Sequence, residues 1–224
     1  SLLLNHRVFL SVGHDEYWST GQRANVEAAR DAGVNLQFLS GNEVYWHTRY
    51  EASTVDAASN GYRTLVSYKE TWSNAKVDPS STWTGTWRDP RFAPPSAGAG
   101  RPENALTGSM YRANDDDLPI TVTADQGKTR LWRGTTLSSL AAGSSAPLAP
   151  HTVGYESNEV TDNGFSPAGL IKLSTTTGVT PQLLQDFGNT VAPGTTTHNL
   201  TLYRAPSGAL VFGAGTIQWA WGLT

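Results

Sequence analysis

The chain has 224 residues, no cysteine, and 19 acidic against 16 basic side chains, which gives a net charge of −3. The lack of cysteine excludes disulfides, thiolate metal sites and cysteine nucleophiles. The basic residues are scattered along the chain, whereas a nucleic-acid-binding surface needs them clustered, so we expect no nucleic-acid partner. No apolar run approaches the ~20 residues of a membrane-spanning helix, so we expect no membrane partner.

The first predicted elements form a β-α-β unit. Residues 8–12 and 36–40 are short, largely apolar runs, each followed by a glycine and then by acidic and aromatic residues that end in Tyr-Trp. Residues 19–32 predict one helix, because Ser19 and Gln22 have the spacing of a capping box. A right-handed crossover makes the two strands parallel and brings both glycine turns to one edge of the sheet, where open α/β sheets bind ligands.

The remainder of the chain changes character twice. Residues 61–70 alternate as a strand does, whereas residues 71–104 hold four aromatic side chains without a period, which predicts a structured, functional loop. From residue 105 onward, short strands between turns are predicted at 106–112, 119–123, 129–133, 152–156, 169–174, 181–187, 198–205 and 209–214. We expect one mixed domain over residues 1–224, and a boundary near 105–115 is the alternative.

The common catalytic motifs are missing, since the chain has no Gly-x-Ser-x-Gly, His-Glu-x-x-His or phosphate-binding glycine loop. What remains is an oxygen-rich set at three strand ends: His14, Asp15, Glu16 and Tyr17, then Asn42, Glu43 and Tyr45, and finally Glu156. Carboxylate and phenolate oxygens are hard ligands that suit magnesium, manganese or ferric iron. The alternative interpretation is that the aromatic residues belong to the core and the acids are solvated.

Four segments carry a resemblance to a known family: residues 13–18, 40–46, 100–108 and 154–156. They resemble the C-terminal domain of the large (beta) subunit of N,N-dimethylformamidase, in a secreted bacterial branch with immunoglobulin-like modules upstream. The resemblance implies a flavodoxin-like, class I glutamine amidotransferase-like three-layer α/β sandwich with a β-rich C-terminal half. It further implies that upstream strands are missing from this chain, that the protein is secreted, and that upstream modules or oligomeric partners accompany the domain.

The same resemblance implies a mononuclear non-haem iron that is held by two tyrosines and one glutamate. By motif position these ligands are Tyr17, Tyr45 and Glu156. The fallback candidates for the second tyrosine are Tyr50, Tyr62 and Tyr68. The implied activity is hydrolysis of the C–N bond of a small linear amide such as a formamide.

Catalytic roles follow under this hypothesis. His14 or Glu16 is the expected general base, and Asn42 is expected to orient the substrate or the developing oxyanion. Two positions depart from the family pattern, because Gly154 stands where a histidine is expected and Asp15 where a proline is expected. These departures bear on the substrate more than on the metal.

A rival hypothesis from another class is a non-catalytic module that binds carbohydrate or a cell-surface polymer. Trp18, Trp46 and the aromatic residues of 71–92 would then line a crevice and stack on sugar rings.

Overall fold

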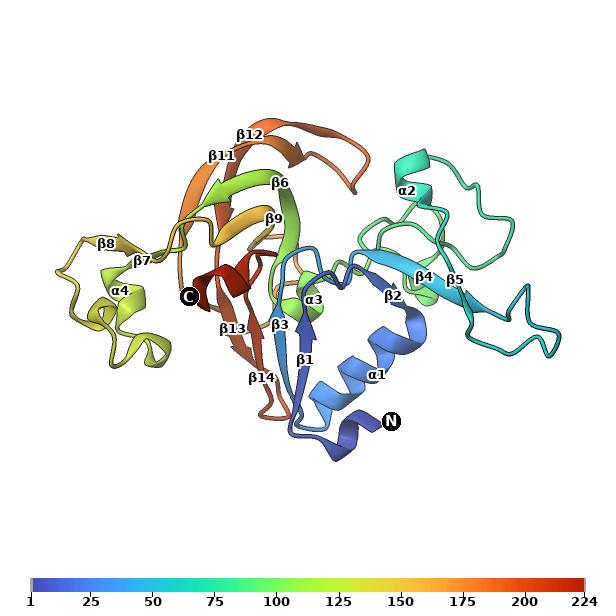
Figure 1. The fold of residues 1–224 in the computed structure, drawn as a ribbon, viewed down its shortest axis with the longest axis horizontal. Coiled ribbons are helices and arrows are strands. Elements are labelled where there is room, and N and C mark those ends of the chain that lie inside the picture. Colours follow the sequence, from blue (N-terminus) through green and yellow to red (C-terminus); the bar gives the residue numbers. More distant parts are fainter. Residues whose placement is uncertain (1, 224) are drawn as a thin grey trace.

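The computed structural model describes residues 2–223 (Figure 1). The helices are α1 (Thr20–Asp31), α2 (Glu70–Ser73), α3 (Asn104–Thr107) and α4 (Ala124–Gly127). The strands are β1 (Val8–Val12), β2 (Tyr17–Ser19), β3 (Asn35–Leu39), β4 (Trp46–Glu51), β5 (Thr64–Val66), β6 (Met110–Leu118), β7 (Thr121–Thr123), β8 (Ser145–Pro147), β9 (Val153–Glu159), β10 (Ile171–Lys172), β11 (Thr176–Leu184), β12 (Val191–His198), β13 (Thr201–Arg204) and β14 (Leu210–Gly213). Short 3₁₀ helices are η1 (Leu2–Asn5), η2 (Pro95–Ala97), η3 (Arg130–Trp132), η4 (Thr136–Ser139) and η5 (Trp219–Leu223). In the described part of the chain, no helix has the length and apolar character that crossing a membrane requires.

The predicted β-α-β unit is present. β1 and β3 pair in parallel, and α1 forms the crossover between them. The helix begins with the expected capping box, in which the Ser19 hydroxyl accepts from the Gln22 amide and the Gln22 side chain accepts from the Ser19 amide. Val26 and Leu36 then join one hydrophobic core between the helix and the sheet. The pairing places the turns after β1 and β3 at the same edge of the sheet, as the sequence predicts.

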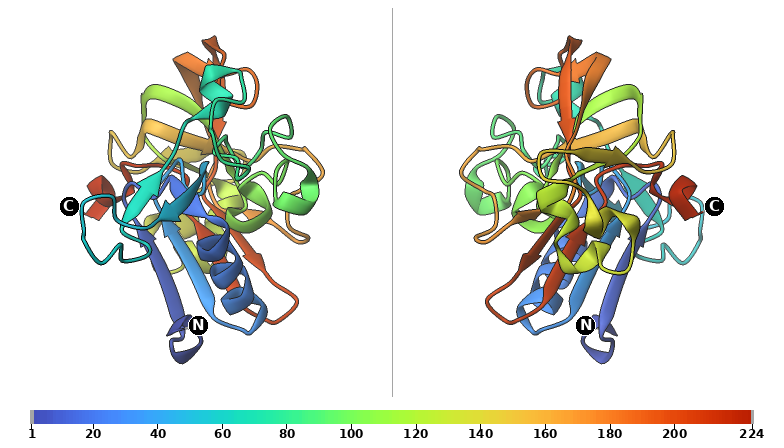
Figure 2. Two further views of the ribbon diagram at one scale, coloured as in Figure 1. Left: turned by 90° about the vertical axis from the view of Figure 1, so that its right-hand side faces the viewer. Right: turned by 90° about the vertical axis from the view of Figure 1, so that its left-hand side faces the viewer.

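The sheet continues with strands from the far end of the chain, in the order β1-β3-β14-β13-β10. β14 runs parallel to β3, whereas β13 pairs antiparallel with β14 across the predicted hairpin at Pro206–Gly208. Figure 2 shows α1 on one face of this sheet. The other face carries the lobe around α4, which consists of β7, α4, η3, η4 and β8. The sheet is therefore mixed, and one long helix covers one of its faces.

The expected flavodoxin-like sandwich is wrong. β6, β9, β11 and β12 close into a separate barrel, and smaller sheets are formed by β2-β4-β5 and β7-β8 (Figure 1). The physical reason is that these strands pair antiparallel with each other, as β6 does with β9 and β11, so no crossover helices are needed to connect them. The predicted strand at 106–112 is partly wrong, because α3 occupies its first residues, and the one at 129–133 is wrong, because η3 lies there and no strand does; β8 and β12 were not predicted.

The loop of residues 71–104 is structured, as predicted, and it packs over the β-α-β unit. Trp83 and Trp87 are each 1% exposed and belong to the same core as Trp18. The buried Arg23 of α1 donates to the backbone oxygens of Arg101 and Pro102, and its guanidinium lies over the Trp87 ring. The loop is thus part of the hydrophobic core and positions the strands behind the site.

Candidate functional site

A cavity of about 370 Å³ lies where the barrel meets the turns that follow β1 and β3. Figure 1 shows the β11–β12 hairpin reaching over this region toward α2. The cavity is lined by Glu16, Asn42, Tyr45, Trp46, Lys69, Trp72, Tyr111, Asn114, Glu156, Gln182, Leu184, Gly188, Asn189 and Val191. Three of the predicted strand-end segments therefore meet at one cavity.

Two carboxylates are held together by one carboxamide. The Nδ2 group of Asn42 donates to Glu16 Oε2 at 2.7 Å and to Glu156 Oε1 at 3.0 Å. Burial raises the pKa of Glu156, and the neighbouring Glu16 raises it further. Two acids at this separation repel each other when both are ionised, so the arrangement favours a proton or a cation between them.

The position of Asn42 is fixed, but its side-chain oxygen has no hydrogen-bond partner. Its backbone amide donates to Asn158 Oδ1 at 2.9 Å, and its φ of 56° is a left-handed conformation. The preceding Gly41 lies so close to β9 that a Cβ atom there would come within 2.5 Å of the Glu156 carbonyl oxygen. The side-chain Oδ1 of Asn42 is buried and has no hydrogen-bond partner. A buried acceptor without a donor is costly, which is consistent with a water, substrate or cation at this point.

Tyrosines form the aromatic wall of the cavity. Tyr45 is 4% exposed, and its ring meets that of Tyr111 edge-on with 5.2 Å between centroids. Tyr17 packs against the same cluster, close enough to Glu16 and Glu156 for their charges to act on its hydroxyl. Burial raises the pKa of all three phenols, and the charge on Glu156 adds to this for Tyr17 and Tyr111. Ionisation of these phenols at neutral pH therefore requires a nearby cation.

A buried ion pair supports the two inner tyrosines from behind. Arg88 pairs with Glu103, and both side chains are almost completely buried. The Arg88 guanidinium lies 5.0 Å from the centre of the Tyr45 ring and donates to the backbone oxygen of Tyr111 at 2.8 Å. Glu103 accepts from the Tyr111 amide at 3.2 Å. The pair thus fixes both rings in the cavity wall.

The predicted site residues divide into three groups. Glu16, Asn42, Tyr45 and Glu156 line the cavity, and Tyr17 adjoins it through Glu16. His14 does not line this cavity; its ring shares a 3.0 Å hydrogen bond with the Tyr155 hydroxyl, and its Nδ1 is 3.8 Å from Glu156 Oε2. The fallback tyrosines do not line the cavity and are 37%, 84% and 43% exposed, in the order Tyr50, Tyr62 and Tyr68. The metal-ligand and catalytic roles remain predictions.

The structure also adds residues that the sequence did not point to. Tyr111 lies within a predicted strand, but no neighbouring motif marked it. Lys69 places its ammonium 5.2 Å from the Tyr17 ring centre, 5.1 Å from that of Trp46 and 5.5 Å from that of Trp72. Its charge opposes the upward shift in the pKa of Glu156. A lysine caged by rings has no sequence signature, because the rings come from three separate segments.

Two acids of the strand-end set point elsewhere. Asp15 accepts from the Ser11 hydroxyl and from the indole of Trp18, so it fastens the turn after β1. Glu43 is 1% exposed and accepts from Asn158 Nδ2, and burial raises its pKa to about 8. Neither residue lines the cavity.

The cavity thus brings together paired carboxylates, phenols and a carboxamide, which are groups that can act in acid–base catalysis. The chain belongs to the family described as N,N-dimethylformamidase beta subunit-like, C-terminal, because the model of that family matches residues 1–224. The predicted family is thereby confirmed, and at a coarse level the family is consistent with the amidohydrolase class. No curated protein matches the chain.

Gly188 offers a test of how tightly the barrel closes on Tyr45. It adopts a φ of +125°, and a Cβ atom there would collide with the Tyr45 hydroxyl oxygen. We expect Gly188→Ala to lower the free energy of unfolding, measured in urea, by roughly 1–3 kcal/mol more than Gly208→Ala does. Gly208 is the matched control, because it also has a positive φ but has open space around it. Equal losses of unfolding free energy in the two variants would show that the β11–β12 hairpin shifts to make room, so that it does not hold Tyr45 in place.

Proposed function

We propose that this domain is an iron-dependent amidohydrolase that cleaves the C–N bond of a small linear amide. The observation that carries the proposal is Asn42, which bridges Glu16 and Glu156 inside the cavity while its own buried oxygen lacks a partner. The confirmed family supports the reaction class.

The donor set fits a hard cation. Among residues 2–223, no three His, Asp or Glu side chains gather as a cation-binding group, so a cation here must also use phenol or amide oxygens. Tyr45 and Glu156 supply such oxygens to one cavity, and Tyr17 adjoins it. We assign these three residues as the ligands. When bound, iron would supply a Lewis acid that also acidifies water.

The protein's own residues then have separate tasks. Glu16 is the general base, because it borders the cavity and its position is fixed by the hydrogen bond from Asn42. Asn42 orients the substrate together with the two carboxylates that its amide group holds in place. His14, which is mostly exposed and lies 3.8 Å from Glu156, is the second candidate for the general base. Trp46 and Trp72 restrict the cavity to a small substrate.

The test begins with metal content. Protein made in iron-replete medium is expected to contain about one iron per chain and to absorb visible light through phenolate-to-iron charge transfer. Tyr17→Phe and Tyr45→Phe should lose both signals, while the matched control Tyr62→Phe, on an 84% exposed residue, should keep them. No bound transition metal in the unmodified protein would overturn the proposal.

The reaction is tested separately. Release of amine from a panel of formamides and acetamides is measured for the iron-loaded protein and for Glu16→Gln. We expect Glu16→Gln to retain iron and to lose at least 10²-fold in rate, as removal of a general base does. If Glu16→Gln keeps full activity, a different group is the base.

The carbohydrate-binding hypothesis finds no support in the site. Trp18, Trp46, Trp83 and Trp87 are all 4% exposed or less and present no free ring faces for stacking on sugars. Trp72 is 65% exposed and lines the cavity, but no second ring of that set lies exposed beside it to form a stacking platform.

A further inference from the structure

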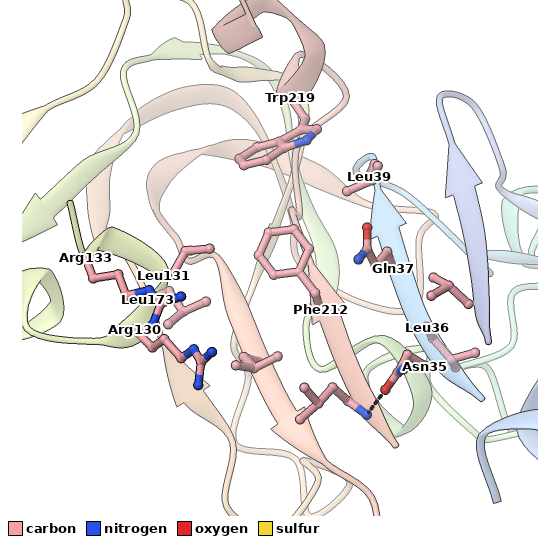
Figure 3. Close-up of a pocket in the computed structure, with 13 residues that line it drawn as sticks. Asn35, Leu36, Gln37, Leu39, Arg130, Leu131, Arg133, Leu173, Phe212 and Trp219 are labelled. Carbon is pink, nitrogen blue, oxygen red and sulfur yellow. Dashed lines mark hydrogen bonds between the residues drawn. The ribbon is translucent and has the colours of Figure 1, made fainter. Parts of the chain in front are cut away.

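A second and larger hollow lies on the other side of the molecule from α1. It has a volume of about 680 Å³ and shares no lining residue with the candidate site. Figure 3 shows its centre occupied by the rings of Phe212 and Trp219, with β3 along one side and the turn at η3 along the other. These two rings lie 5.7 Å apart and are only partly buried.

The hollow exists because the second face of the sheet is incompletely covered. Along β3, Leu36 and Phe38 point into the core with α1, so Gln37 and Leu39 point the other way and line the hollow. Parallel strands are normally buried on both faces. Here the lobe around α4 covers the second face near β13, but Val8 of the edge strand remains 40% exposed. An apolar floor is thus left open to a ligand.

The charged side chains that line this hollow are both basic. Arg130 and Arg133 line its edge, and Figure 3 shows both side chains beside Leu131 and Leu173. Within residues 2–223, no carboxylate pairs with either guanidinium. The sequence holds no aspartate or glutamate between Asp125 and Glu156, although the whole chain carries a net charge of −3. A negative group at this edge would meet two unpaired guanidiniums.

We propose that this hollow binds a small amphipathic anion, with an apolar body over Phe212 and Trp219 and a carboxylate or sulfonate head at Arg130 and Arg133. The volume lies in the range of about 300–1,000 Å³ that is usual for small-molecule sites. Guanidinium groups bind such heads through paired, charge-assisted hydrogen bonds. The site is independent of the amide-cleaving function and stands if that function fails.

Two dyes with the same ring system test the charge requirement. They are 8-anilino-1-naphthalenesulfonate, which carries a sulfonate, and the neutral N-phenyl-1-naphthylamine, and their binding is followed by fluorescence. We expect the sulfonate dye to bind once per chain and at least 10-fold more tightly than the neutral dye. Dodecanoate should displace it, and dodecyltrimethylammonium should not.

Substitutions assign the binding to this hollow. Arg130→Gln/Arg133→Gln should weaken the sulfonate dye at least 10-fold and the neutral dye less than 2-fold. Leu131→Asp, on a 46% exposed side chain, should repel the sulfonate dye to a similar degree. Lys128→Gln is the matched control, because Lys128 bonds to the Ser138 oxygen and does not line the hollow, and it should change neither dye.

Three outcomes would overturn the proposal. The first is equal affinity for the two dyes, and the second is unchanged binding in the double arginine variant. The third is a dimer in sedimentation that dissociates on Leu131→Asp, which would assign the hollow to a second copy of the chain.

Discussion

Arg88→Met is expected to lower the free energy of unfolding by about 3–5 kcal/mol, because it leaves the fully buried Glu103 without its charge partner. The loss should reach the site as well. Arg88 contacts the Tyr45 ring and the Tyr111 backbone oxygen, so both rings lose a support. Urea unfolding at pH 7, followed by tryptophan fluorescence, measures the change. If the domain binds iron as proposed, the visible absorption of the iron-loaded variant should weaken in parallel.

A double-mutant cycle separates the charge effect from lost packing. Arg88→Met/Glu103→Gln removes the unpaired charge and can keep the hydrogen bond to the Tyr111 amide, so it should be more stable than Arg88→Met alone. The control is Arg101→Met, since Arg101 pairs with Glu27 at the surface and should cost less than about 1 kcal/mol. If the two substitutions of the cycle simply add, the Arg88–Glu103 pair does not stabilise the wall.

Acid is expected to destabilise the protein through two buried histidines. Burial lowers the pKa of His47 and of His198 to about 4, from an ordinary value of 6.5. Each folded-state pKa lies below the unfolded one, so the stabilising contribution is complete above pH 6.5 and is lost as the pH falls through 4. Each shift corresponds to about 3 kcal/mol.

Substitution of each histidine separates its effect on the free energy of unfolding from the effect of protonating aspartates and glutamates. His198→Gln can still donate to the Ala214 oxygen, and His47→Asn can still donate to the Trp83 oxygen. Each variant should reduce the difference in unfolding free energy between pH 7 and pH 4 by about 3 kcal/mol, measured in urea. His6→Gln, on an exposed residue, should leave the difference unchanged. An unaltered difference in both core variants would show that these histidines are protonated without cost.

The part of the candidate site that lies in the turns after the parallel strands could be predicted from the sequence. Two glycine turns follow parallel strands, so Glu16, Asn42 and Tyr45 had to meet at one edge, and the structure places them around one cavity. Which other tyrosine joins them was not predictable. Tyr111 reaches the cavity through the barrel, and its position depends on the pairing of β6 with β9, some 40 residues further along the chain.

The sequence by itself determined the local structures and the family. A capping box requires only Ser19 and Gln22, the hairpin at Pro206–Gly208 depends on its turn, and the motifs at the strand ends identified the dimethylformamidase-like domain. Only the tertiary structure decided that the β-rich half closes into a barrel, where distant pairs such as Glu159 and His198 meet. The physical reason is the sequence separation of the interacting residues. Caps and turns depend on contacts within a few residues, whereas strand pairing depends on the burial of side chains from the whole chain.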